Sequence, residues 1–473
     1  MKKLCIFLLA GGILLSSCSK DDPDPGEQTQ NLRWSRIDLT GTKYLVLSEG
    51  AATKSSSANS DVFKVDENGN MTAVVFYFTY DENGNSQQTR SDVKVIPDKI
   101  SSYDGGQYMV FRDCQFTDSQ GQDLHIQHYG QNPDFLIRKK DGAVFLLSSA
   151  DLEKFPNNIS KYTAKVDSNG DLFICNSSMI YKVELSGQQT YLRQITPNGI
   201  GASQFLLTDQ ADVLIGTSGM SCNVFNSAGT IYYKNGGFES LRMDSYGYEA
   251  DKCTYFGNYS FFQDGHQLKM IEKRSKYDIV NQISTDTLGI REVNIGSAPP
   301  FSIGKEYSHC SIQTWTDNTS QEDRPVDFTY SSAAISCKNH FILIQGLYLL
   351  VCNRGDNGTR VFIPNQYPKV TNDGKAFEDK MIDNTLFTLN TATHTIQKYD
   401  FETLTYSEVQ YDDSSVGPYI QLSTSLGHNS YIINGVRNSD GRSVVIEINH
   451  STGAVKTTVA PDERKITELI QLN

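Results

Sequence analysis

The most regular pattern of hydrophobic and polar residues lies between residues 166 and 187, where two short apolar segments alternate with turn residues. Asn169 and Gly170 form a hairpin-turn signature, because Asn-Gly readily adopts the positive φ values of tight strand connections. The segments 172–175 and 180–183 are largely apolar on both alternating faces, and such strands need cover on both sides. The pattern therefore predicts a two-stranded unit that packs between neighbours of its own kind.

Units of this kind recur along the chain at nearly constant spacing. Similar strand-and-turn segments end at Gly69, Gly142, Gly187, Gly229, Thr403 and Gly453, and a turn before an apolar strand recurs at Asn339, Asn384 and Asn429. The spacing is 45 and then 42 residues from Gly142 through Gly187 to Gly229, and 45 residues at each step between the asparagines. Periods of about 40 to 50 residues with several strands each are typical of β-propellers, and the 3.6-residue period of helical repeats is absent. We therefore predict an all-β fold, a β-propeller of seven or eight blades of four-stranded antiparallel sheet, over residues 36–473.

The ends of this body are expected to meet. The first unit contains the apolar segments 44–50, 61–69 and 71–78. A strand near Tyr44 is expected to pair with one near residues 466–472, which would close the ring and remove exposed sheet edges. Residues 85–130 and 280–335 carry weak copies or long insertions, which leaves the blade number open between seven and eight. The tyrosine and lysine before an acidic turn, as at Tyr181 and Lys182, resemble units of quinoprotein-like and NHL-like propellers, a resemblance that implies a fold and no activity.

Residues 1–17 are predicted to be a signal peptide. Lys2 and Lys3 supply its positive charge, and the apolar segment 4–15 is shorter than the about 20 residues that a membrane-spanning helix needs. Residues 15–18, Leu-Ser-Ser-Cys, resemble the lipobox of bacterial lipoproteins, which implies that Cys18 is acylated and becomes the first residue of the mature chain. The alternative is an ordinary signal peptide with a chance cysteine.

Residues 18–35 are predicted to be the lipidated cysteine and a disordered tether, because the segment is polar and contains two prolines. Residues 19–22, Ser-Lys-Asp-Asp, resemble the export signal of Bacteroidetes-type surface lipoproteins. This resemblance implies a protein held in the outer membrane by the lipid on Cys18 and facing the cell exterior, and the alternative is a plain solvated spacer.

Charge and cysteine content narrow the choice of partners. The formal net charge of −13 at pH 7 argues against a phosphate-binding surface, so no nucleic-acid partner is expected.

Of nine cysteines, Cys5 leaves with the signal peptide and Cys18 is acylated, and the remaining ones show no C-x-x-C spacing. Most lie in apolar strands and are expected to be small buried hydrophobes. Cys337 and Cys352 flank a hairpin that turns near residue 345 and are the best disulfide candidates.

The sequence contains no complete metal-binding or catalytic motif. Three oxygen-rich triplets resemble the start of a calcium loop: Asp66/Asn68/Asn70, Asp81/Asn83/Asn85 and Asp167/Asn169/Asp171. They lack the bidentate glutamate at the loop end, so hairpin turns explain them better. The sequence contains no G-x-S-x-G elbow, H-E-x-x-H, P-loop or dinucleotide glycine motif. We therefore assign no catalytic residue, metal or cofactor.

The segment of the sequence that best indicates a ligand-binding site is rich in aromatic residues. Residues 246–262 contain seven tyrosine and phenylalanine side chains, and sugars stack on exposed aromatic rings held by a rigid scaffold. Tyr246 and Tyr248 are candidate ligand-binding residues, together with Trp315 in an irregular insertion. The alternative, favoured for the phenylalanines, is that these rings fill the core between blades.

Two functions follow from these observations. The first is a non-catalytic surface module that captures a glycan or protein ligand for an outer-membrane partner. The second is an extracellular propeller enzyme of the glycoside hydrolase or lyase type, with a site in the axial funnel. Its carboxylates would come from loop-like stretches such as 244–251 and 323–327. A purely structural role in an envelope complex is a third, less specific possibility. The sequence favours the binding module.

Overall fold

The computed structural model of the chain is all-β over the residues that it describes. These are residues 32–49, 60–82, 86–127, 130–160, 163–176, 179–187, 189–196, 204–208, 213–217, 228–233, 238–242, 245–249, 253–265, 267–278, 283–294, 302–315, 333–345, 348–354, 359–362, 380–460 and 464–472. Within them, the one helical element is a single turn, α1 (Ser149–Leu152). The all-β prediction is confirmed.

The strands from the two ends of the chain and from its first part form three sheets. One sheet has the order β37 (Lys465–Gln471), β2 (Thr42–Glu49), β3 (Ser60–Asp66) and β4 (Met71–Ala73). A second has the order β1 (Leu32–Ile37), β5 (Val75–Glu82), β6 (Ser86–Ile96) and β9 (Gln115–Thr117). The third has eight strands, in the order β12 (Ala164–Val166), β13 (Leu172–Asn176), β14 (Met179–Ser186), β15 (Gln189–Gln194), β11 (Val144–Leu146), β10 (Phe135–Arg138), β8 (Tyr108–Arg112) and β7 (Lys99–Ser101). A single parallel pairing, Leu146 with Gln189, joins its two antiparallel halves.

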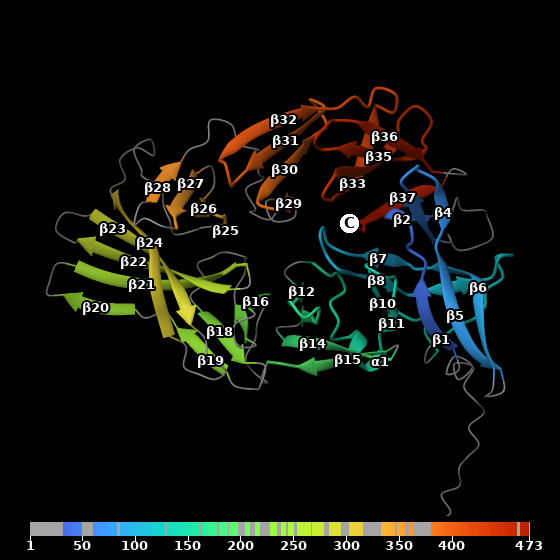
Figure 1. Cartoon of the computed structure of the whole chain (residues 1–473), viewed down its shortest axis with the longest axis horizontal. Coiled ribbons are helices and arrows are strands. Elements are labelled where there is room, and N and C mark those ends of the chain that lie inside the picture. Colours follow the sequence, from blue (N-terminus) through green and yellow to red (C-terminus); the bar gives the residue numbers. More distant parts are fainter. Residues whose placement is uncertain are drawn as a thin grey trace, which may run out of the picture.

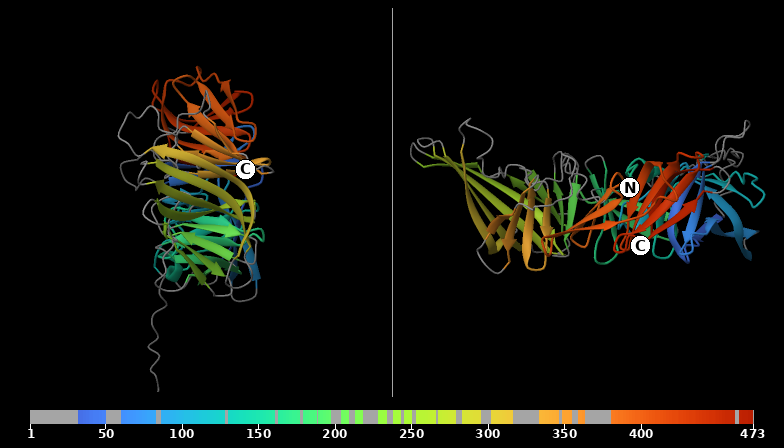
Figure 2. Two further views of the ribbon diagram at one scale, coloured as in Figure 1. Left: turned by 90° about the vertical axis from the view of Figure 1, so that its left-hand side faces the viewer. Right: turned by 90° about the horizontal axis from the view of Figure 1, so that it is seen from above.

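The remaining strands form antiparallel sheets from consecutive segments. The first is a four-stranded sheet of β16 (Gln204–Thr208), β17 (Val213–Thr217), β18 (Ala228–Tyr233) and β19 (Phe238–Arg242), and the second is a five-stranded sheet of β20 (Ser245–Glu249), β21 (Cys253–Asp264), β22 (Gln267–Asp278), β23 (Ile283–Asn294) and β24 (Ser302–Trp315). Two four-stranded sheets follow, one of β25 (Ala333–Ser336), β26 (His340–Gln345), β27 (Tyr348–Asn353) and β28 (Thr359–Phe362), and one of β29 (Met381–Ile382), β30 (Thr385–Asn390), β31 (Thr395–Asp400) and β32 (Thr405–Gln410). The last four-stranded sheet consists of β33 (Tyr419–Leu426), β34 (Ser430–Arg437), β35 (Ser443–Asn449) and β36 (Val455–Val459). The sheets succeed one another in chain order in Figure 1, and Figure 2 shows that the layer they form is wider than it is deep.

The repeat unit at residues 166–187 is a β-hairpin buried on both faces, as its sequence predicts. Strands β13 and β14 pair antiparallel, with Ile174 opposite Tyr181. Leu172 and Ile174 belong to the core cluster that also contains residues of β8 and β10. Phe173 and Cys175, on the other face, pack with Phe205 and Leu207 of β16. The hairpin therefore lies between the other antiparallel half of its own eight-stranded sheet and the sheet of β16.

The sequence echoes of this unit occupy equivalent places in their sheets. Strands β3, β10, β14, β31 and β35 contain these echoes, and each lies next to the last strand, β4, β11, β15, β32 and β36 respectively. The second landmark is equally regular, because Asn339, Asn384 and Asn429 each come directly before the second strand of a sheet. In each case the residue after the third strand donates its backbone N–H to the carbonyl of that asparagine: Arg354, Phe401 and His450, at N···O distances of 3.0, 3.0 and 3.2 Å. The 45-residue period is therefore structural.

One echo was assigned to the wrong place in the repeat. Gly142, Gly187 and Gly453 lie in turns after the third strand and have positive φ values of 68°, 62° and 73°. Gly229 instead lies inside β18, where it pairs with Thr217 and Leu241. The 42-residue step that ended at Gly229 joined a turn glycine to a strand glycine, so it does not measure the repeat.

The first unit also departs from its predicted form. The apolar segment 71–78 is not one strand: β4 ends at Ala73, and β5 begins at Val75 in a different sheet. The residue between them, Val74, is buried and donates its backbone N–H to Val62 O at 2.8 Å. The additional sheet of β1, β5, β6 and β9 explains the weak repeat over residues 85–130. It also places β1 inside the segment 18–35 that was expected to be a tether, because β1 starts at Leu32 and pairs with β5.

The expected pairing of the chain ends is confirmed. Strand β37 runs antiparallel to β2, with Tyr44 opposite Gln471 and Ser48 opposite Ile466. Tyr44 and Val46 of β2 pack with Ile466 of β37 and with Ile432 and Val445 of the neighbouring sheet. Residues separated by more than 400 positions thus share one sheet and one core.

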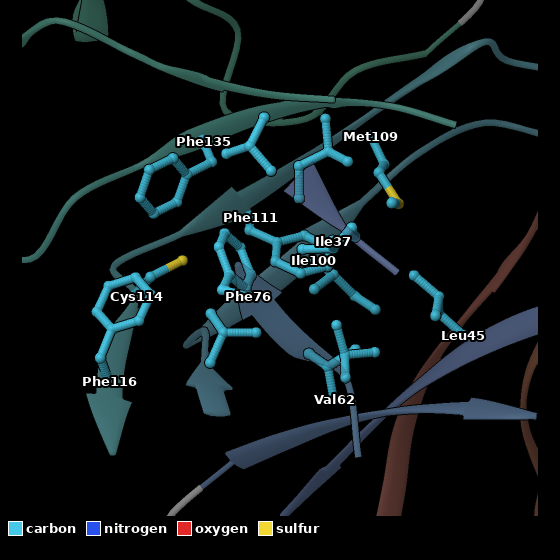
Figure 3. Packing of buried hydrophobic residues seen from close by; sticks show 14 of the residues in the cluster. Ile37, Leu45, Val62, Phe76, Ile100, Met109, Phe111, Cys114, Phe116 and Phe135 are labelled. Carbon is cyan, nitrogen blue, oxygen red and sulfur yellow. The ribbon is translucent and has the colours of Figure 1, made fainter. Parts of the chain in front are cut away.

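Successive sheets share hydrophobic cores. Phe387 of β30 packs with Ile433 of β34, and Leu386, on the other face of β30, packs with Ile335 of β25. The largest cluster joins β2, β3, β8 and β10 to the additional sheet, and Figure 3 shows Phe76 and Phe116 meeting Phe135 there. The ring centroids of Phe76 and Phe116 are 5.7 Å apart in an edge-to-face arrangement, which is favourable for aromatic pairs. Burial between sheets is therefore what holds neighbouring units together.

Candidate ligand-binding site

A polar cavity of about 940 Å³ is lined by residues from four sheets and their connections. It is lined by residues 36–42 before and at the start of β2, Glu67, residues 105–107, residues 138–141, His428 and residues 471–472. Because neighbouring strands are antiparallel, the turn after a first strand and the turn after a third strand lie at the same end of a sheet. These segments therefore gather at one end of the sheets, and residues 471–472, at the end of β37, lie beside them.

Lys139 is the buried lysine among the lining residues, and we call its part of the cavity the floor and the part with exposed residues such as Arg36 and Lys140 the rim. Lys139 follows β10 and is in phase with Phe135 and Ile137, both fully buried, and its own exposed fraction is 7%. Its backbone N–H donates to Gln107 O at 2.9 Å, and its ammonium Nζ donates to Gln471 O at 2.8 Å. The strand alternation thus carries a charged side chain inward, where it meets the last strand of the chain.

The turn that carries Lys139 is fixed by an ion pair. Arg138 donates to the carboxylate of Asp141 at 2.7 Å, and Asp141 also accepts the backbone N–H of Ala143 at 3.2 Å. Gly142 closes the turn at a φ of 68° and donates to Arg138 O at 2.9 Å. The guanidinium of Arg138 is therefore committed to the turn, whereas the ammonium of Lys139 reaches β37.

Burial sets the protonation of Lys139. Removal from water lowers its pKa to about 8, a change that the nearby carboxylate of Asp104 only partly offsets. Asp104 is itself held by Ser425, which donates to it at 2.8 Å, and by the Lys380 ammonium at 3.2 Å. Lys139 is thus mainly protonated at pH 7 and titrates within a range that is easily reached experimentally.

The cavity has an excess of unpaired positive charge. Each of its carboxylates has a cationic partner: Asp38 with Lys64 at 3.1 Å, Glu67 with Lys43 at 3.4 Å and Asp141 with Arg138 at 2.7 Å. Lys139, Lys140 and Arg36 form no ion pair with any described residue, and Arg36 instead lies over the Tyr77 ring at 5.4 Å. This local excess stands out in a chain of formal net charge −13.

Two buried polar atoms at the cavity wall also lack partners. Gln471 Oε1 and Thr42 Oγ1 accept or donate no hydrogen bond within the described part of the chain. A buried polar group without a partner costs about 1–3 kcal/mol, so both atoms favour a bound molecule that supplies one. Gln471 and Thr42 both line the cavity together with Lys139, whose ammonium donates one hydrogen bond, to Gln471 O.

The residues expected from the sequence to bind a ligand lie elsewhere. Tyr246 and Tyr248 are in β20 and Trp315 ends β24, the two opposite edges of the five-stranded sheet. Four strand spacings separate these edges, roughly 19 Å along the sheet. A register shift in the β20–β21 pairing falls between Ser245 and Tyr248. Cys18 lies outside the described residues, so its acylation stays a prediction.

The aromatic stretch contributes at least in part to the core. Phe262 is buried and its ring meets that of Phe341 in an edge-to-face contact at 5.5 Å. This confirms the core interpretation for Phe262, and the binding interpretation of Tyr246 and Tyr248 stays a prediction. Of the acidic residues considered for catalysis, Glu249 is in β20, whereas Asp244, Asp251, Asp323 and Asp327 lie outside the described residues.

The predicted disulfide is wrong. Neither Cys337 nor Cys352 is part of a disulfide bond. Cys337 lies in the turn between β25 and β26 and donates to Phe401 O at 3.5 Å, whereas Cys352 lies in β27 opposite Phe341. Strand β26 therefore runs between the two cysteines, and each thiol faces its own surroundings. The buried thiols of Cys114, Cys175, Cys337 and Cys352 instead fit the predicted role of small hydrophobes.

Two of the three oxygen-rich triplets are hairpin turns, as predicted. Asp66 Oδ1 accepts the backbone N–H groups of Asn68 and Asn70, both at 2.8 Å. Asp167 Oδ1 accepts those of Asn169 and Asp171 at 3.0 and 2.9 Å. In the third triplet Asn83 and Asn85 fall outside the described residues. Throughout the described segments, no three His, Cys, Asp or Glu side chains are close enough together to hold a metal ion. His340 is structural, since its buried ring lies 2.9 Å from Phe401 O.

Lys139 was not among the residues that the sequence predicted to bind a ligand. The segment that ends at Gly142 was predicted to be an echo of the repeat, and no role was predicted for its lysines. The available signal was the phase of the strand, because Lys139 continues the alternation of Phe135 and Ile137 toward the interior. The partner of Lys139 is 332 residues away, which no local pattern reveals.

Comparisons with known proteins assign no family. No protein-family model and no curated protein matches the chain. Among solved structures, the chain is similar to Citrobacter koseri AztD, with 8% identity, a TM-score of 0.30, and coverage of 71% of this chain and 94% of that one. It is also similar to the extracellular domain of BT4673 from B. thetaiotaomicron, with 9% identity, a TM-score of 0.17, and coverage of 91% and 79%. No helix among the described residues combines the length and apolar character needed to cross a membrane.

Proposed function

We propose that this protein is an outer-membrane surface lipoprotein whose β-propeller body binds a glycan or protein ligand without catalysis. The proposal has three parts: the propeller, the anchor and the binding cavity. The observation that carries the binding part is the cavity of about 940 Å³ with unpaired cations on its floor and rim. Its volume lies toward the upper end of the range of about 300–1,000 Å³ that is usual for ligand pockets.

The propeller part is supported by the repetition of sheets. The eight-stranded sheet consists of two antiparallel sets of four strands that are joined by a single parallel pair. With these two counted separately and the sheet of β1 left aside, the described strands form eight successive sets of four or five antiparallel strands. Neighbouring sets share cores, and β37 completes the set of β2 by joining the two ends of the chain. These features favour a propeller of seven or eight blades, and the sheet of β1, β5, β6 and β9 is then an addition to one blade.

The anchor part is supported by the sequence of residues 1–22, all of which lie outside the described residues. Metabolic labelling with a palmitate analogue in a bacterial host tests it. Label on the wild-type chain and none on the Cys18→Ser variant is the expected result, and equal labelling of both would refute it. Protease added to intact cells tests the exterior location, because only a surface-exposed body is cleaved.

The enzyme alternative is weakened by the state of the cavity carboxylates. The hydrogen bond that the Thr40 backbone N–H donates to Asp38 lowers the pKa of this carboxyl group. Burial opposes this shift, and the ammonium of Lys64 adds to it. The Arg138 side chain likewise lowers the pKa of Asp141. Glycoside hydrolysis with a carboxylic acid as proton donor requires a raised pKa. Carboxylates that are held as anions suit charge balance and binding better than general-acid catalysis.

A combined binding and product assay tests the function. Full-length protein in mild detergent is titrated with neutral and acidic polysaccharides, host glycans and envelope proteins while melting temperature and products are measured. A ligand that raises the melting temperature with concentration, forms no products, and loses this effect when Gln107 at the cavity rim is changed to Trp supports the proposal. New reducing ends or unsaturated sugars would establish the enzyme instead.

A further inference from the structure

We infer that the cavity binds an anionic saccharide, with its acidic group on the ammonium of Lys139 and its hydroxyl groups on Gln471 and Thr42. This inference rests on the proposed binding function and adds the chemical class of the ligand. The acidic group is a carboxylate or a sulfate, and both share the chemistry of an oxyanion.

The charges of the cavity select an anion. Lys139 at the floor, and Lys140 and Arg36 at the exposed rim, have no carboxylate partner in the described part of the chain, whereas every carboxylate of the cavity has a cation. A buried ammonium can donate three hydrogen bonds, and Lys139 makes one, to Gln471 O at 2.8 Å. Two donors are therefore left for a ligand, and an oxyanion accepts both while restoring charge balance.

The neutral groups of the cavity select hydroxyls beside that anion. Gln471 is 8% exposed and its Oε1 has no hydrogen-bond partner among the described residues, and the same holds for Oγ1 of the buried Thr42. The two residues belong to the paired strands β37 and β2, and both residues line the cavity. A polyol satisfies an acceptor and a hydroxyl at once, which a bare ion cannot do.

Other charged groups around Lys139 do not change this conclusion. Asp104, the carboxylate that acts on it, is held by Lys380 and Ser425. Arg138 and Asp141 neutralise each other, and His428 at the rim is exposed. A bound oxyanion therefore meets a net positive site, and it competes with no internal anion for Lys139.

The protonation of Lys139 gives the inference its test. The pKa of about 8 means that the ammonium is mostly present at pH 7 and mostly lost at pH 9. If binding needs the ammonium, the apparent dissociation constant scales with the inverse of its protonated fraction, so affinity should fall about tenfold from pH 7 to pH 9. A neutral saccharide of the same backbone should show no such loss.

The experiment is a calorimetric titration of the full-length protein at pH 7, 8 and 9. The probes are a galacturonate trisaccharide, a sulfated trisaccharide and the neutral galactose trisaccharide. Tighter binding of an acidic probe than of the neutral one, with the tenfold loss on raising the pH, is the expected result, and the better acidic probe identifies the oxyanion. Equal or tighter binding of the neutral probe, or pH-independent binding of the acidic ones, would overturn the inference.

Variants separate recognition from a structural role of Lys139. Lys139→Met should remove both the preference for the acidic probe and its pH dependence, and Lys465→Met, at the exposed far end of β37, should change neither. Should Lys139→Met not fold, Lys140→Gln at the rim is the second variant, with an expected several-fold weaker binding of the acidic probe only. Unchanged acidic binding in a folded Lys139→Met protein would overturn the inference.

Failure of this inference and failure of the proposed function are distinguishable. A neutral glycan or an envelope protein that binds the cavity, with no response to acidic saccharides, refutes the inference and leaves the binding function standing. Conversion of any probe to products refutes the non-catalytic function itself.

Discussion

Replacing a single turn glycine should show how tightly neighbouring sheets approach each other. Gly453 and Gly187 occupy the same place in the repeat, the turn after the third strand, and both have positive φ values, 73° and 62°. A Cβ at Gly453 would lie 1.9 Å from Gln410 O at the end of β32, whereas a Cβ at Gly187 would meet nothing within 4 Å. The two positions thus share their backbone strain and differ in the contact with the next sheet.

The magnitude follows from these two terms. A non-glycine residue in the left-handed region costs about 1–2 kcal/mol, and this applies to both Gly187→Ala and Gly453→Ala. At Gly453 the methyl group also overlaps a backbone carbonyl, and forcing a side chain into filled space adds typically 1–3 kcal/mol. Gly453→Ala should therefore lower the free energy of unfolding by about 2–5 kcal/mol, and Gly187→Ala by about 1–2 kcal/mol.

Urea denaturation of the two variants and the wild type, followed by tryptophan fluorescence and circular dichroism, measures the difference. Comparison of midpoints is valid if the slopes agree, because an unchanged slope indicates the same surface exposed on unfolding. Equal destabilisation by the two substitutions would show that the turn at Gly453 does not press against β32. The packing of adjacent sheets described above would then be wrong at this point.

Three further predictions can be tested in the same way. Phe76→Ala should lower the free energy of unfolding by about 3–5 kcal/mol in urea denaturation, because the ring is fully buried against Phe116 and Phe135. Tyr191→Ala, at a side chain that is 48% exposed, should change stability little, and similar losses for both variants would contradict the assigned core. Burial alone would raise the pKa of Asp264, but hydrogen bonds from Arg354, at 2.6 and 2.7 Å, and from Ser336 outweigh burial and lower this pKa. The carboxylate therefore stabilises the fold at pH values above its unfolded-state pKa, and this contribution is lost as the pH falls through its folded-state pKa. Arg354→Met should therefore weaken the acid-induced loss of stability below about pH 4 and destabilise the protein at pH 7, and an unchanged pH profile of the melting temperature would refute the pairing. Burial raises the pKa of Cys175 to about 11 and that of Cys337 to about 12, so the thiols of Cys114, Cys175, Cys337 and Cys352 should react with iodoacetamide only after denaturation, and rapid labelling of any of them in the native protein would place it at the surface.

Local patterns predicted the strands and turns of this protein well. The hairpin at residues 166–187, the asparagine landmarks and the Asp66 and Asp167 turns all formed as expected, because each depends on the preferences of neighbouring residues for turns and for alternating burial. The pairing of Tyr44 with Gln471 was predicted from a general rule, that a repeating array avoids open edges. Errors arose where a local pattern had two solutions, as at Gly229 and at residues 71–78.

The sequence by itself determined the strands, their turns and their period, since these follow from contacts between residues close in the chain. Only the tertiary structure decided which charged side chains meet. Lys139 lies 332 residues from its acceptor Gln471, and Asp104 lies 276 residues from Lys380, so each contact exists because sheets far apart in sequence pack side by side. Cys337 and Cys352, close in sequence, are separated by β26 for the same reason. Strand alternation fixes the face on which a side chain lies, and the packing of sheets fixes what it faces there.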